Sequence, residues 1–189
     1  RSIKFGDFGD GLVKIRRKAD WDMGLVMGSD QVITGTNDSR HRITQTMRKF
    51  IGFTDPYPLH GDKLICRKND HEKGVLNGVT CKAVGSVRVP KGARVLYMDV
   101  EYDGRLLTDQ IVNPGFFQEI YGRRTSFPKG DGILDIDYGY CITVHKSQGS
   151  QWRHVVIADD RMRAQDKLQR QKWLYTAMTR AEEELTYYV

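Results

Sequence analysis

The first third of the chain carries a pattern of apolar and polar positions that predicts two strands followed by a helix. Residues 12–16 (LVKIR) alternate as a half-buried strand does, and residues 31–34 (QVIT) form a short buried strand. Thr36 or Asn37 can begin the helix, because such side chains accept hydrogen bonds from the free N–H groups of a first turn. The apolar positions of that helix recur every three or four residues and predict one buried face, made of Ile43, Met47, Phe50 and Ile51. Three arginines are expected to lie largely outside that face: Arg40, Arg42 and Arg48.

The pattern of an α/β domain returns near the C-terminus. Residues 155–158 (VVIA) are uninterrupted apolar, which is typical of a strand in a parallel sheet that is covered on both faces. A helix over about residues 167–181 and a last strand over residues 185–189 complete the pattern.

Between these two parts the sequence pattern changes to short β-rich segments. They predict a small antiparallel sheet or barrel inserted in the α/β domain. Turn signals separate four such segments, namely 63–67, 79–89, 94–102 and 105–112. The Asp103-Gly104 pair between the last two is a strong hairpin signal. A short helix or turn is expected over residues 114–122, followed by an exposed basic loop with Arg123, Arg124 and Lys129.

Composition limits the possible size of the domain, its compartment and its binding partners. With 189 residues, of which 39% are hydrophobic, the chain can form one packed domain, or one domain that carries a small insertion. Mean hydropathy is −0.54, and neither a bilayer-spanning apolar run nor a signal peptide is visible. Three irregularly spaced cysteines argue against a disulfide framework, and without a CxxC pair they predict no metal site. We therefore expect a cytoplasmic protein without a membrane partner, and its net charge of +6 permits nucleic-acid binding.

The most informative segment is residues 138–152 (YGYCITVHKSQGSQW). Four of its side chains can offer a hydrogen bond or a positive charge to phosphate oxygens: Thr143, His145, Lys146 and Ser147. Gly149 permits an unusual backbone conformation or the close approach of a ligand. A cluster of this kind before a buried strand predicts a phosphate-handling site, and the alternative is an ordinary polar loop with a capping serine.

A second segment, residues 173–181 (WLYTAMTRA), carries Arg180 near the end of the predicted helix. Thr176 and Arg180 share a helix face because they are four residues apart. Tyr175 is expected to pack the helix against the sheet. An arginine at this place either reaches an anion outside the domain or complements the negative end of the helix dipole.

Taken together, the two segments resemble conserved motifs of superfamily 1 helicases. Residues 143–150 (TVHKSQGS) resemble motif V, and residues 174–181 (LYTAMTRA) resemble motif VI, in the same order and with a similar separation. The HKSQG sequence is similar to that of the RecD-like group, which moves 5′ to 3′. Residues 32–37 with Arg40 and Arg48 resemble motif IV, and residues 61–65 and 75–78 resemble the lead into an SH3-like insertion.

The resemblance implies a fold class and a domain plan. The fold would be α/β, a RecA-like second motor domain without a P-loop of its own, carrying a small all-β SH3-like insertion. Residues 1–75 and 136–189 would form the RecA-like domain, and residues 76–135 the insertion.

The resemblance also implies a role for each motif residue. Arg180 would be the catalytic arginine that reaches the γ-phosphate held by the partner domain and stabilises charge there. The residues implied in nucleotide binding are Gln148, Gly149, Gln151, Asn37 and Arg40. The residues implied in contacts with the backbone of single-stranded DNA are Thr143, His145, Lys146 and Ser147.

Two features depart from the family pattern. Residue 151 is Gln where related proteins often carry Glu, and no GxxxxGK[ST] phosphate-binding motif occurs in the sequence. ATP and Mg²⁺ would therefore be held mainly by an N-terminal RecA-like domain of the same parent chain. We expect this chain to be part of a longer protein and to hydrolyse no appreciable ATP alone.

The resulting hypothesis is the C-terminal half of an ATP-dependent DNA helicase that moves on single-stranded DNA. Two alternatives from other classes stay open: a nucleic-acid-binding module without motor activity, and an RNA-directed superfamily 1 helicase. The parent protein could also be a larger recombination nuclease or relaxase.

Overall fold

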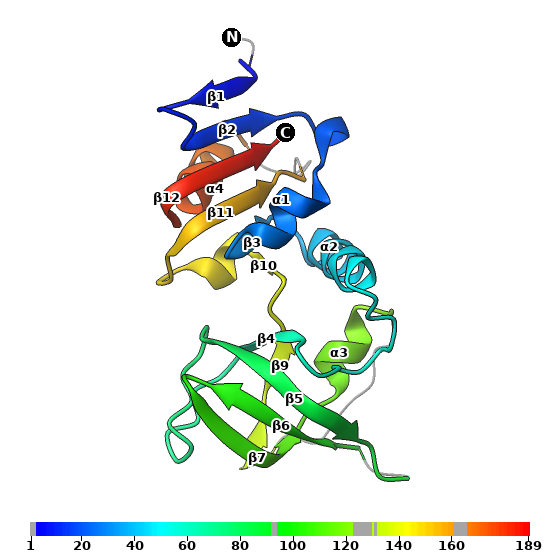
Figure 1. Cartoon of the computed structure of the whole chain (residues 1–189). Helices are drawn as coiled ribbons and strands as arrows, with labels where there is room; N and C mark the ends of the chain where they lie inside the picture. Colours follow the sequence, from blue (N-terminus) through cyan, green and yellow to red (C-terminus); the bar gives the residue numbers. More distant parts are fainter. Residues whose placement is uncertain (1–2, 92–93, 123–129, 131, 161–165) are drawn as a thin grey trace. The chain divides into compact units, whose positions relative to one another are not determined.

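Two six-stranded sheets organise the residues that the computed structural model describes, which are 3–91, 94–122, 130, 132–160 and 166–189. Each sheet belongs to its own unit of the chain (Figure 1). The first unit combines Arg1–Ile43 with Cys141–Val189, and the second is the continuous stretch Thr44–Tyr140. Along the sequence, the second unit is therefore an insertion in the first.

The first sheet is mainly parallel. Its order is β1-β2-β12-β11-β3-β10, and only β1 runs antiparallel to its neighbour. The strands are β1 (Gly6–Phe8), β2 (Val13–Arg16), β3 (Gln31–Thr34), β10 (Cys141–Thr143), β11 (Trp152–Ala158) and β12 (Ala181–Tyr188). Every residue of β3 and the apolar run at the end of β11 are buried, as expected for parallel strands in the middle of a sheet.

Two helices of the first unit lie on opposite faces of this sheet (Figure 1). Helix α4 (Lys167–Met178) buries Trp173 and Ala177, and its N-cap Asp166 accepts a hydrogen bond from the Gln169 N–H at 2.7 Å. Helix α1 (Met23–Gly28) begins at Asp22, which accepts two backbone N–H groups, and follows a short 3₁₀ turn, η1 (Lys18–Asp20). The sequence pattern gave no sign of α1, because a six-residue segment with glycine at two positions has no helical periodicity to detect.

The second sheet is antiparallel apart from one short parallel pair between β7 and β8. Its order is β8-β7-β6-β5-β4-β9. The elements of this unit are β4 (Lys63–Cys66), β5 (Thr80–Arg88), β6 (Leu96–Tyr102), β7 (Arg105–Val112), α3 (Gly115–Glu119), β8 (Ile133–Leu134) and β9 (Ile136–Tyr138). Asp103 and Gly104 join β6 to β7 with φ angles of 49° and 70°, which confirms the predicted hairpin and its turn with two positive φ angles.

Helix α2 (Asn37–Phe50) begins where the capping residues predicted, but only Met47 of its predicted buried face is buried. Phe50 is 59% exposed and Ile51 is also exposed. The buried positions of the helix are mainly polar: Ser39, Arg40, Thr44, Met47 and Arg48. Arg40, Thr44 and Arg48 follow one another at four-residue spacing, so they form one stripe. The apolar pattern failed most clearly at Arg48, which is buried because its guanidinium is hydrogen-bonded, and hydrophobicity does not report such bonds.

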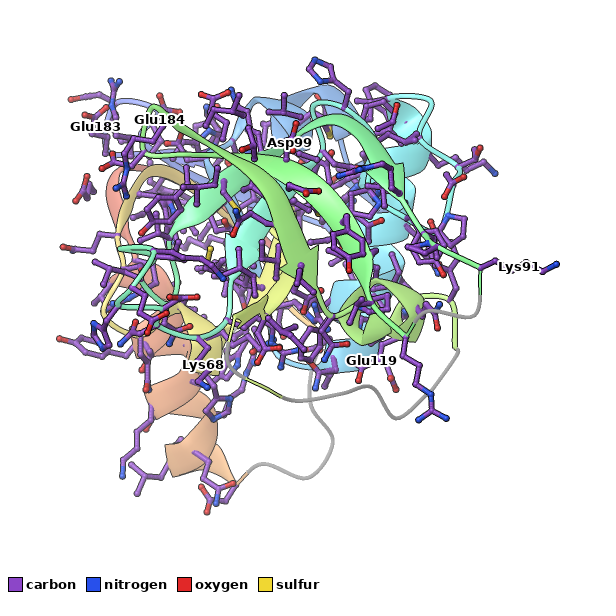
Figure 2. The ribbon with its side chains drawn as sticks, turned by 90° about the horizontal axis from the view of Figure 1, so that it is seen from below. Lys68, Lys91, Asp99, Glu119, Glu183 and Glu184 are labelled. Atoms are coloured by element: carbon purple, nitrogen blue, oxygen red, sulfur yellow. The ribbon has the colours of Figure 1, made fainter. Side chains whose placement is uncertain are left out.

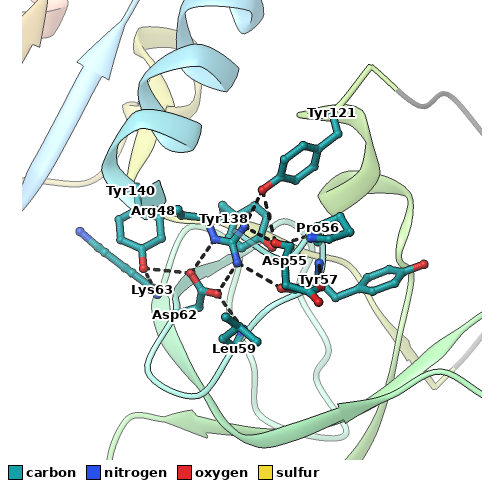
Figure 3. Close-up of polar contacts among 10 residues, drawn as sticks. All are labelled: Arg48, Asp55, Pro56, Tyr57, Leu59, Asp62, Lys63, Tyr121, Tyr138 and Tyr140. Atoms are coloured by element: carbon teal, nitrogen blue, oxygen red, sulfur yellow. Dashed lines mark hydrogen bonds and ion pairs between the residues drawn. The ribbon is translucent and has the colours of Figure 1, made fainter. Parts of the chain in front are cut away.

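Arg48 is the centre of a polar network in the second unit (Figure 3). Its Nε and Nη2 donate to the two carboxylate oxygens of Asp62, each at 2.9 Å, and both side chains are fully buried. The guanidinium also donates to three uncharged acceptors, which are the backbone oxygens of Asp55 at 2.7 Å and Tyr57 at 3.1 Å and the hydroxyl of Tyr121 at 2.8 Å.

Further contacts complete the network on both sides of the ion pair. Asp62 accepts the Tyr140 hydroxyl at 2.9 Å and the Leu59 N–H at 2.7 Å, and Arg48 lies 4.3 Å from the centre of the Tyr138 ring. Burial opposes the charged form of Arg48, but the hydrogen bond and the charge of Asp62 outweigh it, so the pKa of Arg48 is raised. Burial also raises the pKa of both tyrosines, Tyr138 and Tyr140.

The bounds of the two units differ from the expected ones. Residues 1–75 and 136–189 were expected in the α/β part, but β4 pairs with β5 and β9, so both β4 and β9 belong to the second sheet. The β-rich insertion is therefore larger than the expected 76–135. The comparison of the inserted sheet with an SH3 domain stays a prediction.

Charged side chains of the second unit, including Lys68, Lys91 and Glu119, lie exposed on its outside (Figure 2). The expected basic loop with Arg123, Arg124 and Lys129 lies outside the described residues. All three cysteines are buried, and the sulfur atoms of Cys66 and Cys81 are 3.9 Å apart. Within the described ranges, no helix is long and apolar enough to cross a membrane.

Candidate nucleic-acid and nucleotide interface

The parallel strands of the first unit give its sheet two distinct edges. Trp152 pairs with Ala181 at the amino ends of β11 and β12, and Ala158 pairs with Tyr188 at their carboxyl ends. Seven residues of β11 separate the two edges, a span of about 20 Å at roughly 3.3 Å per residue. We call these the amino edge (Ser150–Trp152 with Arg180) and the carboxyl edge (Thr34–Asn37, Thr143 and Ala158–Asp160).

Thr143 lies at the carboxyl edge. It ends β10 and pairs with Thr34 of β3, which itself donates its hydroxyl to the Ala158 oxygen at 2.9 Å. Thr143 is 7% exposed, so its side chain is mostly covered by the domain. The strands thus bring together the ends of the motif IV-like and motif V-like segments.

The 3₁₀ turn η2 (Val144–Ser147) leads away from the carboxyl edge. His145 is exposed and Lys146 is half-buried, so both can meet a ligand outside the unit. Ser147 is fully buried and donates its hydroxyl to the Val144 oxygen at 2.8 Å. The hydroxyl of Ser147 therefore closes the turn, and its predicted contact with DNA has no geometric support.

Arg180 lies at the amino edge, where α4 ends and β12 begins. Its guanidinium donates to the backbone oxygen of Ser150 at 3.0 Å and to that of Ser147 at 3.5 Å. Its Nε donates to the Thr176 oxygen at 3.1 Å, and the backbone oxygen of Arg180 accepts the Trp152 N–H at 2.9 Å. The helix that presents Arg180 is thereby tied to the loop after η2.

Three further predicted residues lie on the same loop. Gln148 and Gly149 are exposed, and Gly149 has a φ of 87°, a conformation that favours glycine. A Cβ at Gly149 would meet nothing within 4 Å, so its surroundings are open. Gln151 is exposed and donates to the Thr179 oxygen at 3.4 Å. Gln148, Gly149, Gln151 and Arg180 therefore share one end of the sheet.

Asn37 and Arg40 are not part of this group. Both lie in the first turn of α2, directly after the carboxyl end of β3, and so on the other edge of the sheet from Arg180. Arg40 is buried and contacts the ring Nε2 of His41 at 2.6 Å, although it was expected to lie outside the buried face of the helix. The nucleotide-binding role of these two residues stays a prediction.

A polar cluster at the carboxyl edge was missed at the sequence level. Asp159 is fully buried and accepts hydrogen bonds from Arg170 of α4 and from the hydroxyl of Tyr187 of β12. Burial, and then the bond to Asp159, raises the pKa of Tyr187. The adjacent Asp160 accepts the Thr36 N–H at 2.8 Å and the Thr36 hydroxyl at 2.7 Å. The only sequence signal was a pair of acidic residues at the end of an apolar strand.

Tyr175 also differs from its prediction. It is 72% exposed, so it does not pack α4 against the sheet, and Trp173 and Ala177 do so instead. Among the described residues, no group of three or more histidine, cysteine or acidic side chains is placed to hold a metal ion.

Comparison with known proteins identifies the motif-bearing part of the chain. Residues 138–187 match the family model of the UvrD-like helicase C-terminal domain. The ATP-dependent RecD2 DNA helicase of Deinococcus radiodurans is 28% identical over 125 residues, which are 65% of this chain and 13% of that protein. These matches support a likeness of this chain to the C-terminal half of a superfamily 1 helicase. This confirms the family suggested by the TVHKSQGS and LYTAMTRA segments.

Solved structures show the same fold for this helicase half. A Pif1 helicase of Bacteroides in complex with ADP-AlF3 and single-stranded DNA aligns with a TM-score of 0.51 and 15% identity, over 88% of this chain and 44% of that one. A second Pif1 structure, from work on DNA unwinding at forked duplexes, aligns with a TM-score of 0.52 and 17% identity, over 88% and 42%. The predicted α/β, RecA-like fold class is confirmed. The helicase half spans less than half the length of each of these relatives.

Proposed function

We propose that this helicase half couples ATP hydrolysis to movement along single-stranded DNA in the protein that contains it, and so takes part in duplex unwinding. The observation that supports this most directly is the short path between the two edges of the first sheet. Thr143 precedes η2 at one edge, and the oxygens of Ser147 and Ser150 accept Arg180 at the other. A ligand on η2 is thus one loop away from the arginine.

The side chains suit these two tasks. His145 and Lys146 are accessible groups that can contact a phosphodiester backbone, which is recognised through charge and hydrogen bonds without reading sequence. Arg180 is held by neutral backbone oxygens, and a phosphate oxygen would compete well for it because charge-assisted hydrogen bonds are stronger. The planar guanidinium can contact two phosphate oxygens at once.

ATP and Mg²⁺ fit this half only as a shared ligand. Arg180 and the open backbone at Gly149 could contact one side of a nucleoside triphosphate. Bound ATP would supply the phosphoryl group that is transferred to water. The sequence has no P-loop motif, and the described residues offer no metal-binding cluster. An N-terminal RecA-like domain would therefore hold the phosphates and Mg²⁺, while this half contributes Gln148, Gly149, Gln151 and Arg180.

The test is ATP turnover stimulated by single-stranded DNA in the full-length protein that contains this chain. Arg180→Ala should lower kcat about a thousandfold or more, the range seen when an arginine finger is lost, while the Kd for DNA stays within about threefold. His145→Ala with Lys146→Ala should do the reverse and weaken DNA binding at low salt most. Arg153→Ala is the matched control, because Arg153 is an exposed arginine on the same sheet, paired with Glu183.

Equal loss of turnover and DNA binding in Arg180→Ala would contradict the separate roles of η2 in DNA binding and of Arg180 in ATP turnover. DNA binding without any turnover in the wild-type protein would favour a binding module. Stimulation by RNA alone would make the protein an RNA-directed helicase. Turnover by residues 1–189 alone would show that this half has a complete nucleotide site.

A further inference from the structure

Two neighbouring aspartates directly after β11 connect the motif IV-like segment to α4, the helix that ends just before Arg180. Successive residues of an extended chain point to opposite sides, so Asp159 and Asp160 can hold different elements. The Asp159 N–H still bonds the Tyr188 oxygen at 3.0 Å, so the pair is anchored to the sheet.

Asp159 faces α4 and β12. It accepts Arg170 and the Tyr187 hydroxyl while being fully buried, and Arg170 also lies 4.6 Å from the centre of the Trp173 ring. Trp173 is one of the two residues of α4 that are buried. Asp159 thus fixes the first half of the helix that ends just before Arg180.

Asp160 faces the start of α2. One of its oxygens accepts both the N–H and the hydroxyl of Thr36, and the Thr36 hydroxyl accepts the Ser39 N–H at 3.3 Å. Thr36 acts as the N-cap of α2 in this way, and Asp160 sets the orientation of that cap. Asp160 is therefore the contact through which the end of β11 holds the motif IV-like loop.

We propose that Asp160, with Asp159 beside it, is a positioning residue that transmits DNA binding at the carboxyl edge to Arg180 at the amino edge. The path begins at Thr143, which pairs with Thr34 just before Thr36. It continues through Asp160 and Asp159 to Arg170 and along α4. Neither aspartate touches the reacting atoms. This inference rests on the proposed function, because it concerns the coupling between DNA binding and ATP turnover.

The experiment compares ATP turnover with and without single-stranded DNA in variants of the full-length protein, using oligothymidylate as the probe. Asp160→Ala should reduce the stimulation by DNA about tenfold or more, because it removes both hydrogen bonds from Thr36 to a charged oxygen. The unstimulated rate and the Kd for oligothymidylate should stay within about threefold of wild type, because Arg180, His145 and Lys146 are unchanged. Asp160→Asn keeps an oxygen that can accept both Thr36 donors, so it should restore most of the stimulation.

Two further variants separate coupling from simple destabilisation. Asp22→Ala removes an aspartate that also accepts two hydrogen bonds at a helix start, from Gly24 and Leu25, but on α1. It should cost similar stability and leave the stimulation unchanged. Thr36→Val should weaken stimulation, and its effect should not add to that of Asp160→Ala, because the two residues act through one contact.

The inference is overturned if Asp160→Ala keeps full stimulation, if Asp22→Ala loses as much, or if Thr36→Val and Asp160→Ala are additive. These results differ from failure of the proposed function, in which the wild-type protein itself shows no DNA-stimulated turnover.

Discussion

Replacing Arg48 by methionine should strongly destabilise the second unit. The change removes both hydrogen bonds to Asp62 and the three bonds to Asp55, Tyr57 and Tyr121. Among the residues that the structure describes, the buried carboxylate would then keep the Tyr140 hydroxyl and the Leu59 N–H as donors. Removing one partner of a buried ion pair costs about 3–5 kcal/mol, which is a large part of the roughly 5–15 kcal/mol that keeps a domain folded.

Urea unfolding of residues 1–189, followed by far-UV circular dichroism, measures this loss. With a slope of about 2 kcal/mol per molar urea, a loss of about 4 kcal/mol lowers the midpoint by about 2 M. Lys49→Met is the matched control, because Lys49 is the next residue of α2 and is exposed. It should change the free energy of unfolding by less than about 0.5 kcal/mol. Trp21, Trp152 and Trp173 all lie in the first unit, so their fluorescence reports that unit separately.

The double variant Arg48→Met with Asp62→Leu tests the reason for the loss. If the cost comes from an uncompensated buried charge, removing both charges should recover part of the stability that the single change loses. A single variant that loses less than about 1 kcal/mol, or a double variant less stable than Arg48→Met, would refute this reasoning.

Two further predictions concern pH and backbone packing. Burial lowers the pKa of His154 in the folded chain. As the pH falls, the unfolded chain therefore takes up a proton at this residue before the folded chain does. The stability linked to His154 should be present above pH 6.5 and decline as the pH falls below it. His154→Gln should flatten the acid side of a tryptophan-fluorescence stability profile between about pH 7 and 5, and an unchanged slope would exclude His154 as its source. Gly139→Ala places a Cβ 2.8 Å from the backbone oxygen of Leu64, so it should cost about 1–3 kcal/mol by urea unfolding. Gly28→Ala is the control, because its Cβ meets nothing within 4 Å, and equal midpoints for the two variants would disprove the steric argument.

Local sequence signals predicted the elements that depend on local chemistry. Residues 31–34 and 105–112 were predicted as strands with the bounds that β3 and β7 have, and the Asp103-Gly104 turn was predicted because it needs positive φ angles. The motifs around Thr143 and Arg180 were visible as polar residues between apolar strands. The chemistry that these motifs can perform can be inferred without knowing the whole fold.

Features that depend on pairing across the chain were not predictable in this way. Arg48 reads as a surface charge until Asp62 and Tyr140, 14 and 92 residues further on, are brought to it by the second sheet. Asp159 and Asp160 likewise look like a loop after a strand, because their partners Tyr187 and Thr36 are distant in sequence. The polar stripe of α2 shows the same limit, since hydrophobic periodicity measures only apolar burial.

The three buried cysteines make the stability of each unit measurable by chemistry. A thiol in the protein core cannot react with a labelling reagent until the surrounding structure opens, so the labelling rate reports the opening equilibrium. Cys66 and Cys81 lie in the second unit and Cys141 lies in the first. Mass spectrometry of labelled peptides would therefore follow the opening of the two units independently in one sample, and would show whether nucleotide or DNA protects one of them more than the other.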